Sequence, residues 1–167
     1  MGPTLYVLSG DALHSYNTTN GVFSTTYDLS TLGLAYDGVS LLSWPAGASA
    51  APDNDGLLVD DGSGQLIHLS PNQTPFVEGT IRLASAPATD DMTALVELDN
   101  VLYIGSGDNS MVVLRYDVGS AAWLTPLDVS DNVLDMTVAT DTAGSTTLFL
   151  AMEGSPVVEE MDPAGTV

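Results

Sequence analysis

The sequence contains no cysteine among its 167 residues. Disulfide frameworks and thiolate metal sites are therefore excluded, and the fold must depend on a packed core. Long apolar segments are missing as well, because no apolar run approaches the roughly 18 residues that a membrane-spanning helix requires. We therefore expect no membrane insertion.

Positive charge is almost absent. The chain has no lysine, and Arg82 and Arg115 stand against 22 acidic residues, which gives a formal net charge of −20 at pH 7. Nucleic acids and anionic membranes are bound through Lys and Arg, so the composition argues against both as partners. Salt or bound cations relieve self-repulsion of this kind. The charge therefore predicts a high-salt environment or a calcium-rich extracellular or cell-surface location, with a generic acidic secreted protein as the plain alternative.

A repeat runs through the sequence, marked by an aromatic residue seven positions after an anchor residue. Phe23, Phe76 and Trp123 occupy this aromatic position in three copies. The four anchors recur at intervals of 53, 47 and 45 residues: Tyr16, Leu69, Tyr116 and Met161. These intervals are typical of β-propeller blades with four strands each. Because the aromatics recur at a structural period, we interpret them as packing residues of an interblade core.

Other columns of the repeat agree with this interpretation. A strand-forming run that closes on glycine precedes each anchor: Leu5–Gly10, Leu57–Gly62, Leu102–Gly107 and, one residue late, Leu148–Gly154. Alternation and turn residues predict strands at 4–9, 12–17 and 22–29, and further innermost blade strands at 36–43, 92–98 and 133–139. Asp99-Asn100 is predicted to form a tight turn between two of them. No segment has sustained helical periodicity, so no helix is expected.

These patterns predict an all-β fold, a β-propeller built of four-stranded antiparallel blades with about three and a half blades in this chain. We expect one domain over residues 1–167, with repeats at about 4–43, 44–98, 99–139 and 140–167. The units resemble blades of quinoprotein-like and kelch-like propellers, as in Leu102–Gly107, Arg115-Tyr116-Asp117 and Trp123. That resemblance implies the propeller fold and leaves enzymes, scaffolds and adhesion proteins as functions.

The first and the last predicted blades each lack one of their four strands. We expect either a piece of a longer propeller or a chain whose open blade edges pair with another copy or another protein. A closed monomeric ring is the less favoured alternative.

Motifs for catalysis are missing from the sequence. It has no nucleophile elbow, no phosphate loop, no zinc-binding His-Glu-x-x-His motif, and neither the kelch nor the quinoprotein signature. The histidines, His14 and His68, fall one column apart in equivalent strands, so we interpret them as strand side chains and not as a catalytic base or metal ligands. No catalytic residue and no required cofactor are predicted.

Aspartates form the one constellation that predicts a ligand. In a propeller, two sets of loops emerge on one face around the channel, and here those loops carry Asp11, Asp60, Asp61, Asp90, Asp91, Asp108 and Asp131. Their convergence would create a site for Ca²⁺, which takes six to eight oxygen ligands. The alternative is that turns favour aspartate for backbone reasons alone. Calcium binding is therefore a hypothesis.

One connection is longer than its counterparts. Residues 43–56 replace what is a two-residue turn at Asp99-Asn100, and long insertions in regular repeats often bind ligands. Trp44 is predicted either to contact a glycan or a partner protein, or to cap the propeller's own edge. Asp53 and Asp55 resemble the start of a calcium loop and complete the predicted binding residues.

The sequence thus favours a non-catalytic propeller module that acts as a binding or assembly scaffold. The alternative is a propeller enzyme, a hydrolase, lyase or oxidoreductase, that uses acidic residues at the channel mouth.

Overall fold

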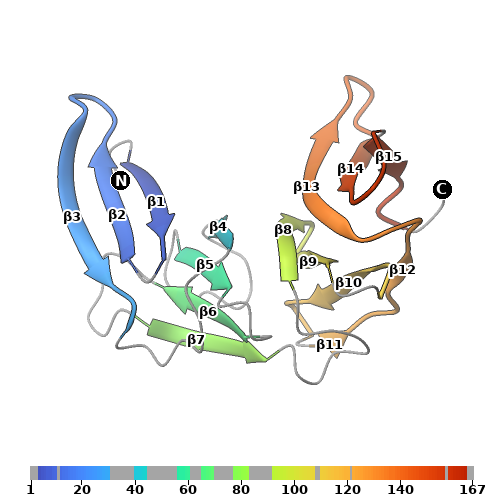
Figure 1. The fold of residues 1–167 in the computed structure, drawn as a ribbon, viewed down its shortest axis with the longest axis horizontal. Helices are drawn as coiled ribbons and strands as arrows, with labels where there is room; N and C mark the ends of the chain where they lie inside the picture. The colour runs from blue at the N-terminus through green and yellow to red at the C-terminus, as the bar shows by residue number, and fades with distance from the viewer. Residues whose placement is uncertain are drawn as a thin grey trace.

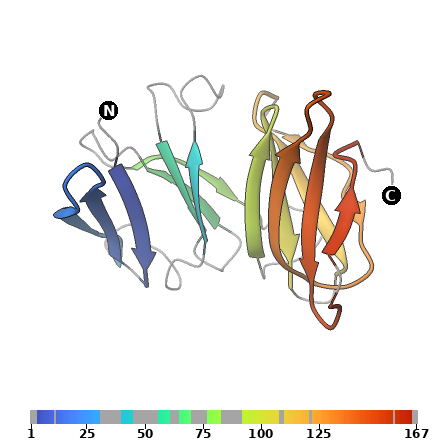
Figure 2. The same ribbon diagram turned by 90° about the horizontal axis from the view of Figure 1, so that it is seen from above.

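Four antiparallel β-sheets follow one another along an open arc (Figures 1 and 2). In this computed structural model the described residues are 4–10, 12–30, 40–44, 56–60, 65–69, 77–82, 92–107, 110–120, 122–156 and 158–164, and for the strands between 40 and 82 we describe backbone pairing alone. Every regular element in these residues is a strand, which confirms the predicted all-β class. None of them belongs to a helix long and apolar enough to cross a membrane.

The first and second sheets are simple meanders in which each strand pairs with the next one in the chain. The first sheet contains β1 (Thr4–Ser9), β2 (Ala12–Asn17) and β3 (Val22–Asp28). The second sheet contains β4 (Ser40–Trp44), β5 (Gly56–Asp60), β6 (Gln65–Leu69) and β7 (Val77–Arg82). Strand β4 contains residues 40–43 of the predicted strand 36–43 and ends one residue later, whereas residues 36–39 lie outside the described residues.

The third and fourth sheets follow the same plan. The third sheet contains β8 (Met92–Leu98), β9 (Val101–Ser106), β10 (Val112–Asp117), β11 (Ala122–Trp123) and β12 (Leu127–Asp128). Both β11 and β12 pair with β10, so together they form one interrupted outer strand. The fourth sheet contains β13 (Val133–Thr140), β14 (Thr146–Met152) and β15 (Val158–Met161).

All four sheets share one register. The leucine that opens the glycine-closing run lies directly opposite the anchor in each sheet: Leu5 and Tyr16, Leu57 and Leu69, Leu102 and Tyr116, Leu148 and Met161. Directly opposite residues of an antiparallel pair share a face of the sheet. The columns read from the sequence are therefore equivalent positions in three dimensions.

The turn between β8 and β9 has the predicted form. Asp99 and Asn100 have φ angles of 52° and 65°, the left-handed values that a two-residue hairpin turn requires and that Asp and Asn tolerate. The Asn100 amide donates to the Glu97 carboxylate at 2.8 Å, which closes the turn. In the second sheet the equivalent connection is residues 45–55, because Trp44 lies opposite Gly56 at the end of the strand pair.

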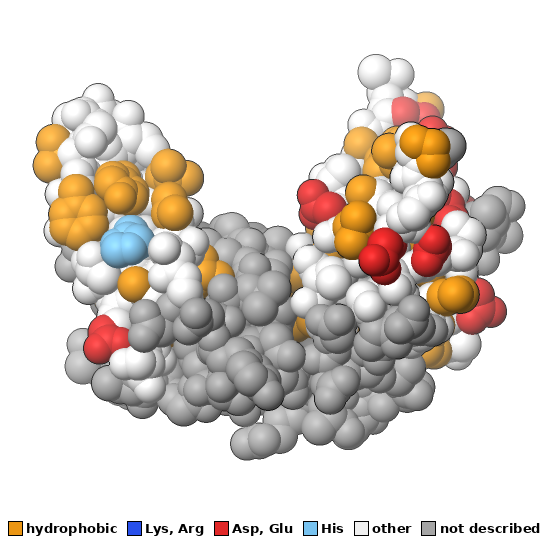
Figure 3. Space-filling model, in the orientation of Figure 1, with side chains coloured by type: hydrophobic (Ala, Val, Ile, Leu, Met, Phe, Trp, Pro, Cys, Tyr) orange, Lys and Arg blue, Asp and Glu red, His pale blue; other side chains and the backbone are white. Residues whose placement is uncertain are grey.

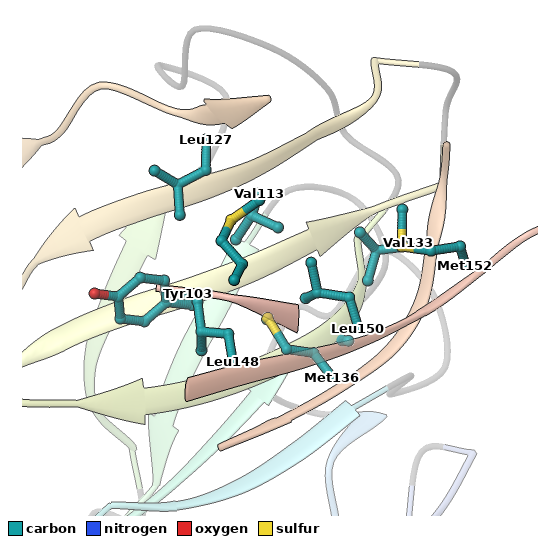
Figure 4. Packing of buried hydrophobic residues seen from close by; sticks show 10 residues of the cluster. Tyr103, Val113, Leu127, Val133, Met136, Leu148, Leu150 and Met152 are labelled. Atoms are coloured by element: carbon teal, nitrogen blue, oxygen red, sulfur yellow. The ribbon is translucent and has the colours of Figure 1, made fainter. Parts of the chain in front are cut away.

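A packed core lies between the third and fourth sheets (Figure 4). Its buried members come from seven strands: Ala94, Tyr103, Val113, Leu127, Val133, Met136, Leu148, Leu150, Met152 and Met161. The sheets approach so closely that a Cβ added at Gly105 would lie 2.7 Å from Cγ1 of Val133. The Thr93 hydroxyl donates to the Val133 carbonyl across the same contact.

Two of the recurrent aromatics, Phe23 and Trp123, each pair with the anchor of their own repeat. Phe23 lies opposite Tyr16, with ring centroids 5.5 Å apart, and Trp123 lies opposite Tyr116 at 5.0 Å, both edge-on. The spacing of seven thus reflects an aromatic pair across the outer hairpin of one sheet. Phe23 is 49% exposed, so the interblade-core prediction is wrong for it. Phe76 lies outside the described residues.

Candidate interaction surface

The predicted calcium ligands lie mostly outside the described residues, namely Asp11, Asp61, Asp90, Asp91 and Asp108. Asp60 ends β5, where its backbone alone is described. Asp131 is half-buried, and its Oδ1 accepts the amide of Asn132 at 2.8 Å. Within the described part of the chain, no group of three or more potential metal-ligating side chains converges. Calcium binding stays a prediction.

The predicted binding residues of the long connection are placed only in part. Trp44 is the last residue of β4, whereas Asp53 and Asp55 lie outside the described residues. The glycan or partner contact at Trp44 and the capping alternative both stay open.

His14 is integrated into the first sheet, in agreement with the interpretation as a strand residue. Its Nδ1 lies 2.9 Å from the Thr26 hydroxyl on the neighbouring strand, and its ring contacts Phe23 with centroids 6.2 Å apart. The second histidine, His68, occupies the middle of β6.

The exposed apolar surface of the first sheet is the most unusual feature of the described residues. Leu5 and Val7 on β1 lie opposite Tyr16 and His14 on β2, and Tyr16 lies opposite Phe23 on β3. We call these five residues the open face. In Figure 3, hydrophobic side chains gather around a histidine on the arm that β1–β3 form.

Equivalent positions in the other sheets show that the open face is a packing face. Leu5 is 53% exposed and Val7 39%, whereas their equivalents in the third sheet, Leu102 and Ile104, are 0% and 1% exposed. In the fourth sheet, Leu148 and Leu150 are fully buried against the third sheet. The open face therefore has the composition of a surface that a neighbouring sheet covers elsewhere in the same molecule.

A second open surface lies at the other end of the arc, on the side of the fourth sheet away from the core. Its members lie opposite one another across the three strands, and we call them the distal face: Asp135, Thr137, Phe149, Ala151, Val158 and Glu160. Val158 is 54% exposed, whereas its equivalent Val113 is fully buried in the core. A shallow hollow on this face is lined in part by Asp135, Phe149 and Val158.

Polar contacts at the rim of the core fix the orientation of the fourth sheet against the third. Arg115 donates through Nε to the Thr125 carbonyl at 2.8 Å and through Nη1 to the Pro163 carbonyl at 3.2 Å. The Tyr103 hydroxyl donates to the same Pro163 carbonyl at 3.3 Å. Burial raises the pKa of Tyr103, and the carboxylates of Asp99 and Asp162 add to that rise against the opposing effect of Arg115. One of the two arginines of the chain thus connects two sheets.

Edge strands add a further open element at each end of the arc. Among the described strands, β1 has a partner only in β2, and β15 only in β14. Strand β1 carries no charged residue, whereas β15 carries Glu159 and Glu160. Charges on an edge strand discourage pairing with another strand, so β1 is the more receptive edge.

Comparison with known proteins identifies the architecture. No protein-family model matches the sequence, and no curated protein matches it. Among solved structures, 553 chains match significantly. One is the crystal structure of Saccharomyces cerevisiae Sqt1, a β-propeller-type protein, with a TM-score of 0.68 at 14% sequence identity; the match covers 98% of this chain and 43% of that one. The chain therefore has a propeller-like fold, and it spans less than half the length of that neighbour.

Sequence reasoning did not identify the open face or the distal face. Leu5 and Val7 are indistinguishable in the sequence from Leu102 and Ile104, because both pairs occupy the same columns of the repeat. One signal was available: the charges Asp135 and Glu160 replace the apolar Ala94 and the bridging Arg115 of the third sheet.

Proposed function

We propose that this chain is a non-catalytic β-propeller module that binds other proteins through the open face and the adjoining edge of β1. The observation that supports the proposal is the exposure of Leu5 and Val7 at positions that are fully buried in the third and fourth sheets. A contiguous apolar surface of this kind is characteristic of protein interaction sites.

The chemistry of the open face fits a protein partner. Leu5, Val7 and Phe23 supply exposed apolar area, and Tyr16 and His14 combine apolar rings with polar atoms. Aromatic residues with a polar atom are enriched at the centres of protein interfaces. The uncharged edge of β1 offers backbone donors and acceptors to an added strand.

Photocrosslinking from the open face tests the proposal. A photoreactive phenylalanine at Val7 should form covalent adducts with protein partners in the native extract, because that position lies in the proposed contact. The matched control carries the same group at Ala143, an exposed residue of the turn between β13 and β14. The absence of adducts at Val7, or equal adducts at both positions, would contradict the proposal.

The finer architecture and the environment belong to the same proposal. The sheet order supports about three and a half blades, with the first sheet lacking the innermost strand and the fourth lacking the outermost strand among the described residues.

We further propose an extracellular or cell-surface location and calcium at the aspartate-rich loops, for which the net charge of −20 is the support. Calorimetry with Ca²⁺ would remove the calcium proposal if it gave neither heat nor a melting shift.

A further inference from the structure

We infer that the open face is an acceptor for a second copy of this chain, whose distal face stacks on it head to tail. This inference rests on the proposed function, because it names the partner of the same surface. It follows from the packing of the third and fourth sheets, which serves as an internal template for the contact.

The template shows which two surfaces belong together. In the core, the third sheet contributes Tyr103 and Val113, and the fourth sheet contributes Leu148, Leu150 and Met161. The distal face carries Phe149 and Val158 at the positions of Tyr103 and Val113. The open face carries Leu5, Val7 and Tyr16 at the positions of Leu148, Leu150 and Met161. Each exposed surface thus corresponds to one side of a contact that the molecule already makes.

The residues of the open face and the distal face allow two copies to approach as closely as the third and fourth sheets do. In the template, Gly105 is required because Val133 of the innermost strand presses against it. The distal face has Ala151 at that position. Among the described strands the first sheet has none equivalent to β13, so nothing corresponding to Val133 would press on the extra methyl group.

Charge favours the head-to-tail arrangement over association of two like faces. Two distal faces brought together would oppose Asp135 and Glu160 with their own copies, and like charges at close range are destabilising. On the first sheet, the single acidic strand residue is Asp28, at the end of β3, where it is hydrogen-bonded to Ser30. The acidic distal face therefore meets a surface that is free of carboxylates over its centre and contains His14.

Complementation between two blocked variants tests the inference. Leu5→Asp places a charge on the open face, and Val158→Asp places one on the distal face; both residues are about half exposed, so folding should persist, as checked by far-UV circular dichroism and melting. Sedimentation equilibrium should show self-association of the wild type, stronger at 1 M than at 0.15 M NaCl because salt screens the net charge of −20.

Each variant alone should associate at least about tenfold more weakly than the wild type, whereas an equimolar mixture should form a heterodimer through its one intact pair of faces. Met111→Asp changes an exposed apolar residue that directly precedes β10 and lies outside both faces; this control variant should behave as the wild type. Should Leu5→Asp fail to fold, Leu5→Ser and Val7→Ser provide milder blocks of the same face.

Several outcomes would overturn the inference. A wild type that stays monomeric at both salt concentrations removes it, as does a Val158→Asp variant that associates normally, because that result indicates two open faces in contact. A monomeric wild type whose Val7 still crosslinks to a different protein refutes the second copy and leaves the proposed function intact. Absence of both self-association and crosslinks refutes the two together.

Discussion

The first and third sheets present the same columns of residues to different surroundings. Leu5 and Leu102 occupy equivalent positions in equivalent strands, lie opposite equivalent tyrosines, and belong to sheets with equivalent aromatic pairs. Leu102 is nevertheless fully buried and Leu5 is 53% exposed. The difference shows that the local sequence determines the strand, the register and the face, whereas a neighbouring sheet determines whether that face contributes to stability or remains available for binding.

The largest expected effect comes from truncating the same side chain in both sheets. Leu102→Ala should lower the free energy of unfolding by about 2–5 kcal/mol, since it removes buried methyl groups and leaves a cavity. Leu5→Ala should cost less than about 1 kcal/mol in dilute monomer, because its side chain is half in water. Urea unfolding at low protein concentration measures both. Equal losses of unfolding free energy in the two variants would contradict the difference in burial between Leu102 and Leu5.

The second effect concerns the close contact between the third and fourth sheets. Gly105→Ala should destabilise the protein by about 1–3 kcal/mol, because the added Cβ would meet the fully buried Val133 at 2.7 Å. The reverse change at the equivalent position, Ala151→Gly, relieves no clash and should show only the smaller backbone effect of glycine in a strand. Thermal unfolding of both variants compares an occupied face with an open one. An unchanged melting temperature in Gly105→Ala would contradict the close contact between Gly105 and Val133.

Much of this fold was predictable because turn-forming residues and the alternation of apolar and polar residues act within a short stretch of sequence. The strands at 4–9, 12–17 and 92–98 have the predicted bounds, and the Asp99-Asn100 turn has the left-handed angles that its residues suggest. Residues 40–43 of the predicted strand 36–43 belong to β4, which continues to Trp44, since an apolar run alone does not fix where pairing with the next strand ends. The interblade-core prediction was wrong for Phe23, because a spacing of seven identifies recurrence and cannot distinguish packing between sheets from pairing across one hairpin.

A third, smaller effect tests the polar rim of the core. Tyr103→Phe removes the hydrogen bond to the Pro163 carbonyl and should cost about 0.5–1.5 kcal/mol, since the ring that packs in the core is retained. Because burial raises the pKa of Tyr103, its neutral form is favoured in the folded state. The stability that it contributes is complete below the unfolded pKa of about 10 and is lost as pH rises through the folded value.

Unfolding measured between pH 8 and 11 should therefore show a decline in wild-type stability that is reduced in Tyr103→Phe. The same decline in both proteins would assign the effect to other groups.

The smallest effect is expected where the two sheets should not differ. Asp28 in the first sheet and Asp117 in the third both lie at strand ends, and both have a lowered pKa because Ser30 and Ser120, respectively, donate hydrogen bonds to them. A lowered folded pKa gives stability that is present above the unfolded value near 3.8 and is lost as pH falls through the folded one. Asp28→Ala and Asp117→Ala should each slightly reduce the loss of stability between pH 5 and pH 2. A clear difference between the two would show that their surroundings matter more than the turn.

The candidate surfaces were less predictable than the fold, for a physical reason. The exposure of Leu5 depends on which sheet adjoins it, and no property of its own strand reports that neighbour. The sequence predicted a calcium site because it assigned seven aspartates to loops, yet Asp60 belongs to strand β5, and turns favour aspartate for backbone reasons. Asp131 illustrates this, since its carboxylate accepts the adjacent amide of Asn132.

Covalent footprinting of side chains, followed residue by residue at increasing protein concentration, tests the central claim most directly. In dilute solution Leu5 and Val7 should react about as strongly as the exposed Leu134, whereas Leu102, Ile104, Leu148 and Leu150 should be protected. As the concentration rises, Leu5 and Val7 should become protected together with Val158, while Leu134 serves as the reference. Protection of Leu5 and Val7 in the dilute monomer, or their unchanged reactivity at every concentration, would contradict the account.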